Sequence, residues 1–77
     1  NPFNPATKFS YSIPKDLKVT LEVFDMTGRR IAVLVDKYQI SGQYQVDYNA
    51  SGLSSGVYIY RLSSEYQTIS RKMMLLK

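Results

Sequence analysis

One short segment of the chain has the spacing of a nucleophilic serine motif. Residues 52–56 read Gly-Leu-Ser-Ser-Gly, which matches the pattern G-x-S-x-G with Ser54 at its centre. In hydrolases with this motif the serine lies on a sharp turn between a strand and a helix, and a histidine accepts its proton. In this chain a run of strand-forming residues follows the motif and no histidine is present, so a serine–lysine pair is the catalytic alternative left open. We interpret the segment as a loop in which Gly52 and Gly56 adopt unusual backbone conformations.

Six carboxylates are the other groups that could perform acid–base chemistry or bind a metal. They are Asp16, Glu22, Asp25, Asp36, Asp47 and Glu65. No two of them have a spacing that suggests the acid pair of a glycosidase, and no Asp-rich calcium loop is present. Because the chain also lacks His and Cys, the sequence predicts a protein that is not an enzyme and has no metal or cofactor site. Asp25 is instead expected to cap backbone N–H groups at the start of a turn.

Seven Tyr and three Phe raise the alternative of a carbohydrate-binding surface. An exposed row of aromatic rings could stack on sugars, whereas rings within strands pack against neighbouring strands and keep a hydroxyl in water. Six aromatic residues fall within predicted strands: Phe9, Tyr11, Tyr44, Tyr48, Tyr58 and Tyr60. Packing within the sheets is therefore the favoured interpretation. Tyr38 and Tyr66, in or near loops, are the better candidates for exposed rings.

The elements that must position these side chains are strands, because the dominant hydrophobic period is two. Phe9, Tyr11 and Ile13, for example, alternate with polar residues until Pro14 ends the run. The same pattern, less clean in the third segment, predicts about six strands over residues 8–13, 18–23, 31–35, 43–48, 57–62 and 67–77. Short strands at regular spacing, without an amphipathic helical stripe, favour an all-β antiparallel sandwich or small barrel.

Turn residues separate the predicted strands. Residues 25–28 suit a tight turn with Gly28 in the left-handed conformation, which would close a hairpin between the second and third strands. Residues 63–66 suit a second hairpin loop, and residues 49–56 form a longer connection with Leu53 as its expected buried residue. Asn49 begins a formal N-glycosylation sequon, for which a capping role of Asn49 is the favoured alternative. The glycines expected to serve the turns are Gly28, Gly42, Gly52 and Gly56.

Length and charge indicate one small domain of ordinary composition. The 77 residues are 44% hydrophobic, which is typical of a folded domain, and the net charge is +4. The basic residues are scattered rather than gathered on one face, so nucleic acid is not an expected partner. No apolar run approaches the roughly 20 residues of a membrane-spanning helix. Because the chain begins with Asn rather than Met, we expect a piece of a longer polypeptide, with residues 1–6 as an extended linker end and 7–77 as one domain.

Five segments, in order along the chain, resemble one protein family. The opening resembles the N-P-F-N-P-x-T start of type A C-terminal sorting domains of the type IX (Por) secretion system, and an F-x-hydrophobic-x-hydrophobic-P strand follows. The predicted hairpin resembles the V-x-L-x-V-Y-D-x-x-G-R-x segment of that family, with Phe24 where tyrosine is usual. The last two strands resemble its L-x-S-G-V-Y-x-Y-R-L segment and its K-hydrophobic-x-hydrophobic-x-K close. The five segments are residues 1–7, 9–14, 19–30, 53–62 and 71–77, so the resemblance covers essentially the whole chain.

The resemblance implies an antiparallel immunoglobulin-like β-sandwich of about six to seven strands, similar also to the Ig-like domain of flagellar hook-capping proteins. It implies a non-catalytic sorting signal for a larger cargo protein, which a signal peptide elsewhere directs to the periplasm. The implied partners are the outer-membrane type IX translocon, a sortase-like peptidase that removes the domain, and the N-terminal cargo domain of the same chain. The cargo would then be secreted or attached to the cell surface. The alternatives are a structural spacer and a carbohydrate-binding accessory module of an extracellular enzyme.

The last predicted strand is the candidate for recognition by a partner. Four consecutive apolar residues at 73–76 place side chains on both faces of a strand, so only one face can enter the core. The other face or the free edge could contact a partner, with the neighbouring basic residues steering its approach. The candidate recognition residues are Arg71, Lys72, Met73, Met74, Leu75, Leu76 and Lys77. The alternatives are a last core strand without a recognition role, and sheet edges that pair to form a dimer.

Overall fold

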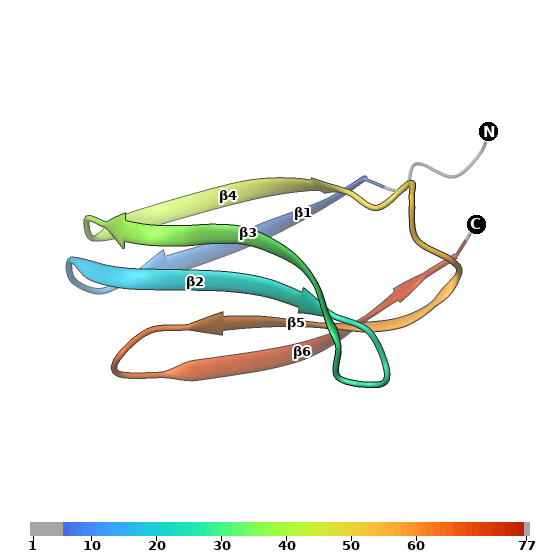
Figure 1. Cartoon of the computed structure of the whole chain (residues 1–77). Coiled ribbons are helices and arrows are strands. Elements are labelled where there is room, and N and C mark those ends of the chain that lie inside the picture. The colour runs from blue at the N-terminus through green and yellow to red at the C-terminus, as the bar shows by residue number, and fades with distance from the viewer. Residues whose placement is uncertain (1–5, 77) are drawn as a thin grey trace.

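The computed structural model describes residues 6–76, which in that range form six antiparallel strands and no helix. The strands are β1 (Ala6–Ile13), β2 (Leu17–Phe24), β3 (Arg30–Gln39), β4 (Gly42–Asn49), β5 (Gly56–Ser63) and β6 (Thr68–Leu75). β1 and β4 form a two-stranded sheet, and the others form a four-stranded sheet in the order β3-β2-β5-β6 (Figure 1). This confirms the predicted all-β antiparallel sandwich and is compatible with an immunoglobulin-like fold. None of the described elements is a helix long and apolar enough to cross a membrane.

The core lies between the two sheets, and β2 supplies its centre. Val19, Leu21 and Val23 of β2 point inward, with exposed fractions of 0%, 2% and 0%. Thr20 and Glu22 between them are half-buried, so burial follows the alternation of the sequence. From the facing sheet, Phe9 and Ile13 of β1 are buried against this row. The period of two therefore predicted the inward face of both strands correctly.

Aromatic residues of the strands pack against this core. The rings of Phe9 and Tyr60 contact across the two sheets, with centroids 4.6 Å apart. Tyr11 and Tyr44 stack within the two-stranded sheet, with centroids 5.5 Å apart. These contacts confirm the packing interpretation of the strand aromatics. Among the aromatic residues in 6–76, the strongly exposed rings are the two expected to be exposed, Tyr38 and Tyr66.

β3 departs from strict alternation at two β-bulges. Its register with β2 shifts once in the middle and once at the end of β2. Each shift leaves one extra residue on β3, Leu34 at the first bulge and Ile31 at the second. The less clean pattern of residues 31–35 has this physical cause, because each extra residue breaks the period of two.

Asp25 organises the turn of the β2–β3 hairpin, as the sequence predicts. Its Oδ1 accepts hydrogen bonds from the backbone N–H groups of Thr27 and Arg29, at 2.9 and 3.0 Å, and from the Thr27 hydroxyl at 2.6 Å. Gly28 donates its N–H to the Asp25 carbonyl at 3.0 Å and has a φ of +87°. This is the left-handed region that side chains disfavour, so the turn requires glycine at this position.

The connection between β4 and β5 buries a different residue from the one predicted. Ala50 is 1% exposed, whereas Leu53 is only half-buried. The Leu53 N–H donates to the Ala50 carbonyl at 3.0 Å, and this turn places Ala50 rather than Leu53 against the sandwich. The Oδ1 of Asn49 accepts the Ser51 N–H at 3.0 Å, which confirms the capping role of Asn49. Gly52 does not adopt a positive φ, so its backbone does not require glycine.

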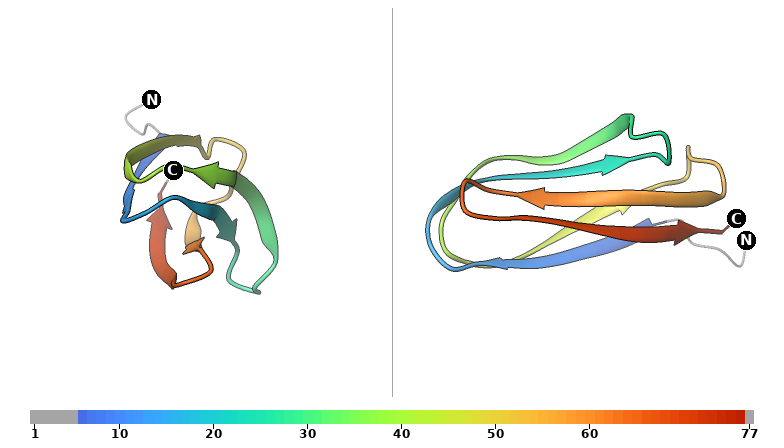
Figure 2. Two further views of the ribbon diagram at one scale, coloured as in Figure 1. Left: turned by 90° about the vertical axis from the view of Figure 1, so that its left-hand side faces the viewer. Right: turned by 90° about the horizontal axis from the view of Figure 1, so that it is seen from below.

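Two short connections cross between the sheets at the same end of the molecule. Residues 14–16 join β1 to β2 and residues 40–41 join β3 to β4, so that two strands face four (Figure 1). The Phe9 ring of β1 reaches Tyr60 of β5 across the sandwich, and β1 runs on the β6 side of the four-stranded sheet (Figure 2). Residues 1–5 of the predicted linker end and the candidate Lys77 lie outside the described residues, and β1 already includes Ala6.

Candidate functional site

Acidic side chains on β2 and β3 form ion pairs across the hairpin. The Oε2 of Glu22 lies 3.1 Å from Nη1 of Arg30, and the Oδ1 of Asp36 lies 3.4 Å from Nζ of Lys18. Within residues 6–76, no group of three or more His, Cys, Asp or Glu gathers in a way that could hold a metal ion. These carboxylates stabilise strand pairing at the surface, where such pairs contribute little individually.

Two further carboxylates organise connections. Asp16 accepts the Ser41 N–H at 2.9 Å and thereby ties together the two connections that cross between the sheets. At Asp25, the hydrogen bond from the Thr27 side chain and that from the Arg29 N–H hold the pKa of the carboxyl below its ordinary value of 3.8. A carboxylate held in its ionised form suits the role of hydrogen-bond acceptor and not that of a proton donor.

The serine motif has the loop geometry that the sequence predicts. Ser54 is exposed in the connection between β4 and β5, and Gly56 is already the first residue of β5. The carbonyl of Ser54 accepts the Tyr58 hydroxyl at 2.7 Å. A strand rather than a helix follows the motif, so the strand–turn–helix arrangement that presents a nucleophilic serine is not formed here.

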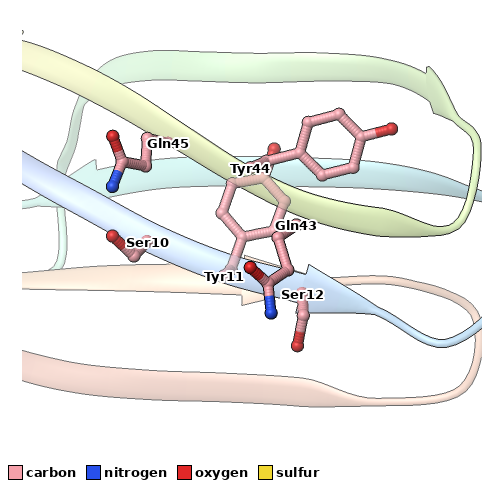
Figure 3. Close-up of a pocket in the computed structure, with 6 residues that line it drawn as sticks. All are labelled: Ser10, Tyr11, Ser12, Gln43, Tyr44 and Gln45. Atoms are coloured by element: carbon pink, nitrogen blue, oxygen red, sulfur yellow. The ribbon is translucent and has the colours of Figure 1, made fainter.

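A shallow hollow of about 720 Å³ lies on the two-stranded sheet (Figure 3). The polar side-chain groups of its lining are hydroxyls and amides, and two aromatic rings add apolar surface; the lining residues pair across β1 and β4: Ser10, Tyr11, Ser12, Gln43, Tyr44 and Gln45. The Tyr11 hydroxyl donates to Oε1 of Gln39 at 2.7 Å, and the Tyr44 hydroxyl donates to the Ile40 carbonyl at 2.5 Å. Burial raises the pKa of Tyr11 above 10.0, against a smaller lowering by the Gln39 hydrogen bond. The hollow therefore supplies neutral hydrogen-bonding groups and no acid–base pair.

The candidate recognition residues lie on β6 and directly after it. Arg71 and Met73 pair with Tyr60 and Tyr58 of β5, which places them on the inward parity, and Met73 packs against the core. Leu75 shares this parity and is half-buried. The other parity faces out, and its two apolar members have exposed fractions of 69% and 60%, at Met74 and Leu76 respectively. Within the apolar run 73–76, Met73 packs against the core and Leu75 is half-buried, whereas Met74 and Leu76 are exposed.

β6 is also an edge strand. Within the described sheets it pairs with β5 alone, so the backbone groups along its other side have no strand partner. Arg71 and Lys72 are exposed on this strand. A free edge with apolar side chains and flanking cations is chemically suited to pairing with a strand of another protein.

An apolar patch beside Met74 on the outer face of the four-stranded sheet is absent from the sequence-based predictions. Met74 pairs with Val57, and Phe24 pairs with Ile59, so these side chains share one outer face. The Arg61 guanidinium lies 4.5 Å from the centre of the Phe24 ring. The sequence feature that could have indicated this patch is the continuous run of strand-forming residues 57–62, which leaves apolar side chains on both faces of β5.

The comparison with protein families covers nearly the whole chain. The family model described as "Secretion system C-terminal sorting domain" matches residues 1–76. No curated protein and no solved structure gives a significant match. The matched range includes the motifs near both ends of the sequence and every strand of the sandwich. The chain therefore belongs to the family of type IX secretion system C-terminal sorting domains.

Proposed function

We propose that this domain directs a larger cargo protein across the outer membrane, and that the type IX translocon recognises it through the outward side of β6. Family membership supports the role of sorting signal. The observation that carries the recognition proposal is the exposure of Met74, at 69%, on a strand with a free edge and of Leu76, at 60%, directly after it. We refer to the outward residues Lys72, Met74 and Leu76 as the outer β6 strip.

The outer β6 strip offers three kinds of binding energy. Complete burial of a Met or Leu side chain contributes about 1.5–3 kcal/mol, so each of the two apolar residues could change binding at least tenfold. Backbone groups along the free edge could add hydrogen bonds to a partner strand. Lys72 would act mainly on the rate and orientation of approach.

The proposed export route is the one that membership of the sorting-domain family implies. The cargo reaches the periplasm through its own signal peptide, and the translocon then binds this domain at the outer membrane. A sortase-like peptidase removes the domain after passage, and the cargo is secreted or attached to the cell surface. In this route the domain contributes a recognisable surface and no catalytic group.

The test is export of a reporter protein fused to residues 1–77, in a host with type IX machinery. Met74→Asp and Leu76→Asp each introduce a charge into the outer β6 strip and should lower export about tenfold or more. Met26→Asp and Ile40→Asp are matched controls, because these residues are 67% and 66% exposed and lie in turns outside β6. The control variants should be exported as well as the parent.

Thermal unfolding of each variant domain separates loss of recognition from loss of folding. Deletion of Lys72–Lys77 should abolish export as well, but it removes half of β6, so the point variants are more informative. Equal export of the parent, strip and control variants would contradict recognition through β6. Failure of the parent fusion to be exported would favour the spacer function instead.

A further inference from the structure

The inward face of β6 is covered at Met73 and left open at Ile69 and Arg71. β6 is the edge strand beside β5, and β1 runs along the β6 side of the four-stranded sheet without pairing with β6 (Figure 2). The register pairs Ile69 with Leu62 and Arg71 with Tyr60, so both side chains share the inward parity with residues that pack against the core. Ile69 is nevertheless 36% exposed and Arg71 is exposed. A third strand added to the two-stranded sheet beside β1 would cover them.

A groove runs between β1 and β6 along this open part of the inward face. It consists of two hollows of about 240 and 180 Å³, which share Ser12, Leu62 and Ile69. The core forms its floor, because Leu21 lines the first hollow and Val19 the second. We call this space the lateral groove and define it by residues 9–13 of β1, Tyr60 and Leu62 of β5, and Ile69 and Arg71 of β6.

One wall of the lateral groove is a strand edge. Among the described strands β1 pairs only with β4, continuously from Ala6–Asn49 to Ile13–Gly42. In an antiparallel pair, every second residue directs its N–H and C=O away from the partner strand. On β1 these groups point to the side of the groove, because β4 occupies the other side. An extended ligand could therefore bond to the β1 backbone and cover the apolar floor at the same time.

The charged residues that line the lateral groove are cationic. Arg71 lines the first hollow and Lys15 lines the second, and neither lining includes Asp or Glu. The Nζ of Lys15 lies 4.2 Å from the centre of the Tyr66 ring, at the end of the second hollow. A groove with this charge favours a ligand that carries carboxylates among apolar residues.

We propose that the lateral groove binds an extended acidic segment of a partner protein, which pairs with the free edge of β1 as a seventh strand of the sandwich. Apolar residues on one parity of the segment cover Ile69, and a carboxylate on the same parity pairs with Arg71. This binding uses the inward face of β6 and the edge of β1. It is therefore independent of the outer β6 strip and of whether that strip mediates export.

A second copy of the chain fits the lateral groove less well. If the β1 edges of two copies paired about a two-fold axis, the β6 strands of both copies would lie beside the joined lateral grooves. The inward-facing Arg71 side chains of both copies would then share the joined grooves, and like charges in such an interface are unfavourable. The charge of the groove thus selects an acidic partner over self-association.

The first test uses the 77-residue chain and a synthetic peptide of the length of β1, with acetyl and amide ends. The peptide reads Thr-Val-Thr-Glu-Thr-Val-Thr-Val, so that valines and one glutamate share one parity. NMR titration should show saturable binding with a Kd of about 1 mM or tighter, with shifts at the amides of β1 and at Ile69 and Arg71. Amides of β1 that do not bond to β4 should exchange more slowly with solvent when the peptide is bound. Absence of binding, or shifts confined to β3 or β4, would overturn the proposal.

Two peptide controls test the mode of binding without altering the protein. A peptide N-methylated on one set of alternate residues loses the hydrogen bonds of one edge, and a peptide methylated on the other set loses those of the opposite edge. One of the two should lose binding and the other should retain it, because a ligand at a strand edge pairs through one side only. Equal binding of both would exclude strand addition.

A charge exchange tests the role of Arg71. Arg71→Glu should weaken binding of the glutamate peptide about fivefold, and should restore binding of a peptide with lysine in place of the glutamate. The restored affinity shows that the variant is folded and that the charge pair is specific. If the parent and Arg71→Glu bind the glutamate peptide and the lysine peptide equally, the proposed preference of the groove for an acidic ligand is wrong. A concentration-dependent dimer that competes with the peptide would assign the lateral groove to a second copy of the chain.

Discussion

Replacement of Leu21 by alanine tests whether the inward row of β2 carries the stability of the sandwich. Leu21 is 2% exposed and pairs with Val35 on β3 and Leu62 on β5, within the buried cluster that includes Phe9. Paired strands hold it on both sides and the second sheet covers it, so the space left by truncation cannot close by side-chain movement alone. Leu-to-Ala changes at such positions cost about 2–5 kcal/mol, and we expect about 3 kcal/mol here.

This loss is large beside the stability expected of the whole chain. At about 0.05–0.15 kcal/mol per residue, 77 residues correspond to a free energy of unfolding of about 4–12 kcal/mol. The Leu21→Ala variant should therefore lose at least roughly a quarter of the stability of the parent. For a domain of this size, its Tm should fall by about 12–24 °C.

Urea unfolding, followed by circular dichroism or by the fluorescence of the seven tyrosines, measures the change. With an m-value of about 1 kcal/mol/M, the midpoint for Leu21→Ala should fall by about 3 M. Val33→Ala is the control, because Val33 lies on β3 and is 44% exposed, and its unfolding free energy should change by less than about 0.5 kcal/mol. A loss below about 1 kcal/mol for Leu21→Ala, or no larger than that of Val33→Ala, would refute the reasoning.

Two predictions concern the β2–β3 turn and use the same unfolding measurement. Gly28→Ala should lower the free energy of unfolding by about 1–2 kcal/mol through its φ of +87° alone, since no atom lies within 4 Å of the added methyl group. Gly52→Ala is the control, because Gly52 is equally unobstructed and has no positive φ, and this change should leave the free energy of unfolding unaltered. Equal effects of the two changes would contradict this account. Because the pKa of Asp25 is lowered on folding, its carboxylate stabilises the folded state at pH values above 3.8. This stabilisation is lost as the pH falls through the lower pKa of the folded state. On acidification below pH 3.8, the free energy of unfolding should therefore decline less for Asp25→Asn than for the parent. Identical declines would contradict the role of Asp25.

The strands and tight turns could be predicted because their signals are local. Alternation along residues 18–23 follows directly from a strand with one buried face, and Asp25 and Gly28 have the side chain and the backbone that the turn requires. The β-bulges of β3 could not be predicted, since they depend on how β3 pairs with β2 and appear in the sequence only as a loss of period. The burial of Ala50 in place of Leu53 likewise depends on a turn that closes against the sandwich.

The candidate site was predictable only in part for the same reason. Four apolar residues at 73–76 already indicate side chains on both faces of the last strand, and the exposure of Met74 and Leu76 agrees with that reasoning. In contrast, Ile69 has the sequence pattern of a core residue and is 36% exposed, because it lines the open space between β1 and the edge strand β6. How strands divide between sheets is a long-range property that no single segment encodes.

The pairing of β1 with β4 joins segments that are far apart in the chain, and this affects how the sandwich assembles and opens. The β2–β3 and β5–β6 hairpins close short loops, whereas the pairing of β1 with β4 closes a longer loop that contains β2 and β3 and costs more conformational entropy. A two-stranded sheet is marginal alone, so β1 and β4 depend on the four-stranded sheet beneath them. We expect these two strands to form the cooperative unit with the lowest free energy of opening. The wall of the lateral groove is thus also the part of the backbone that separates most readily, which would let an incoming strand exchange into the sandwich without global unfolding.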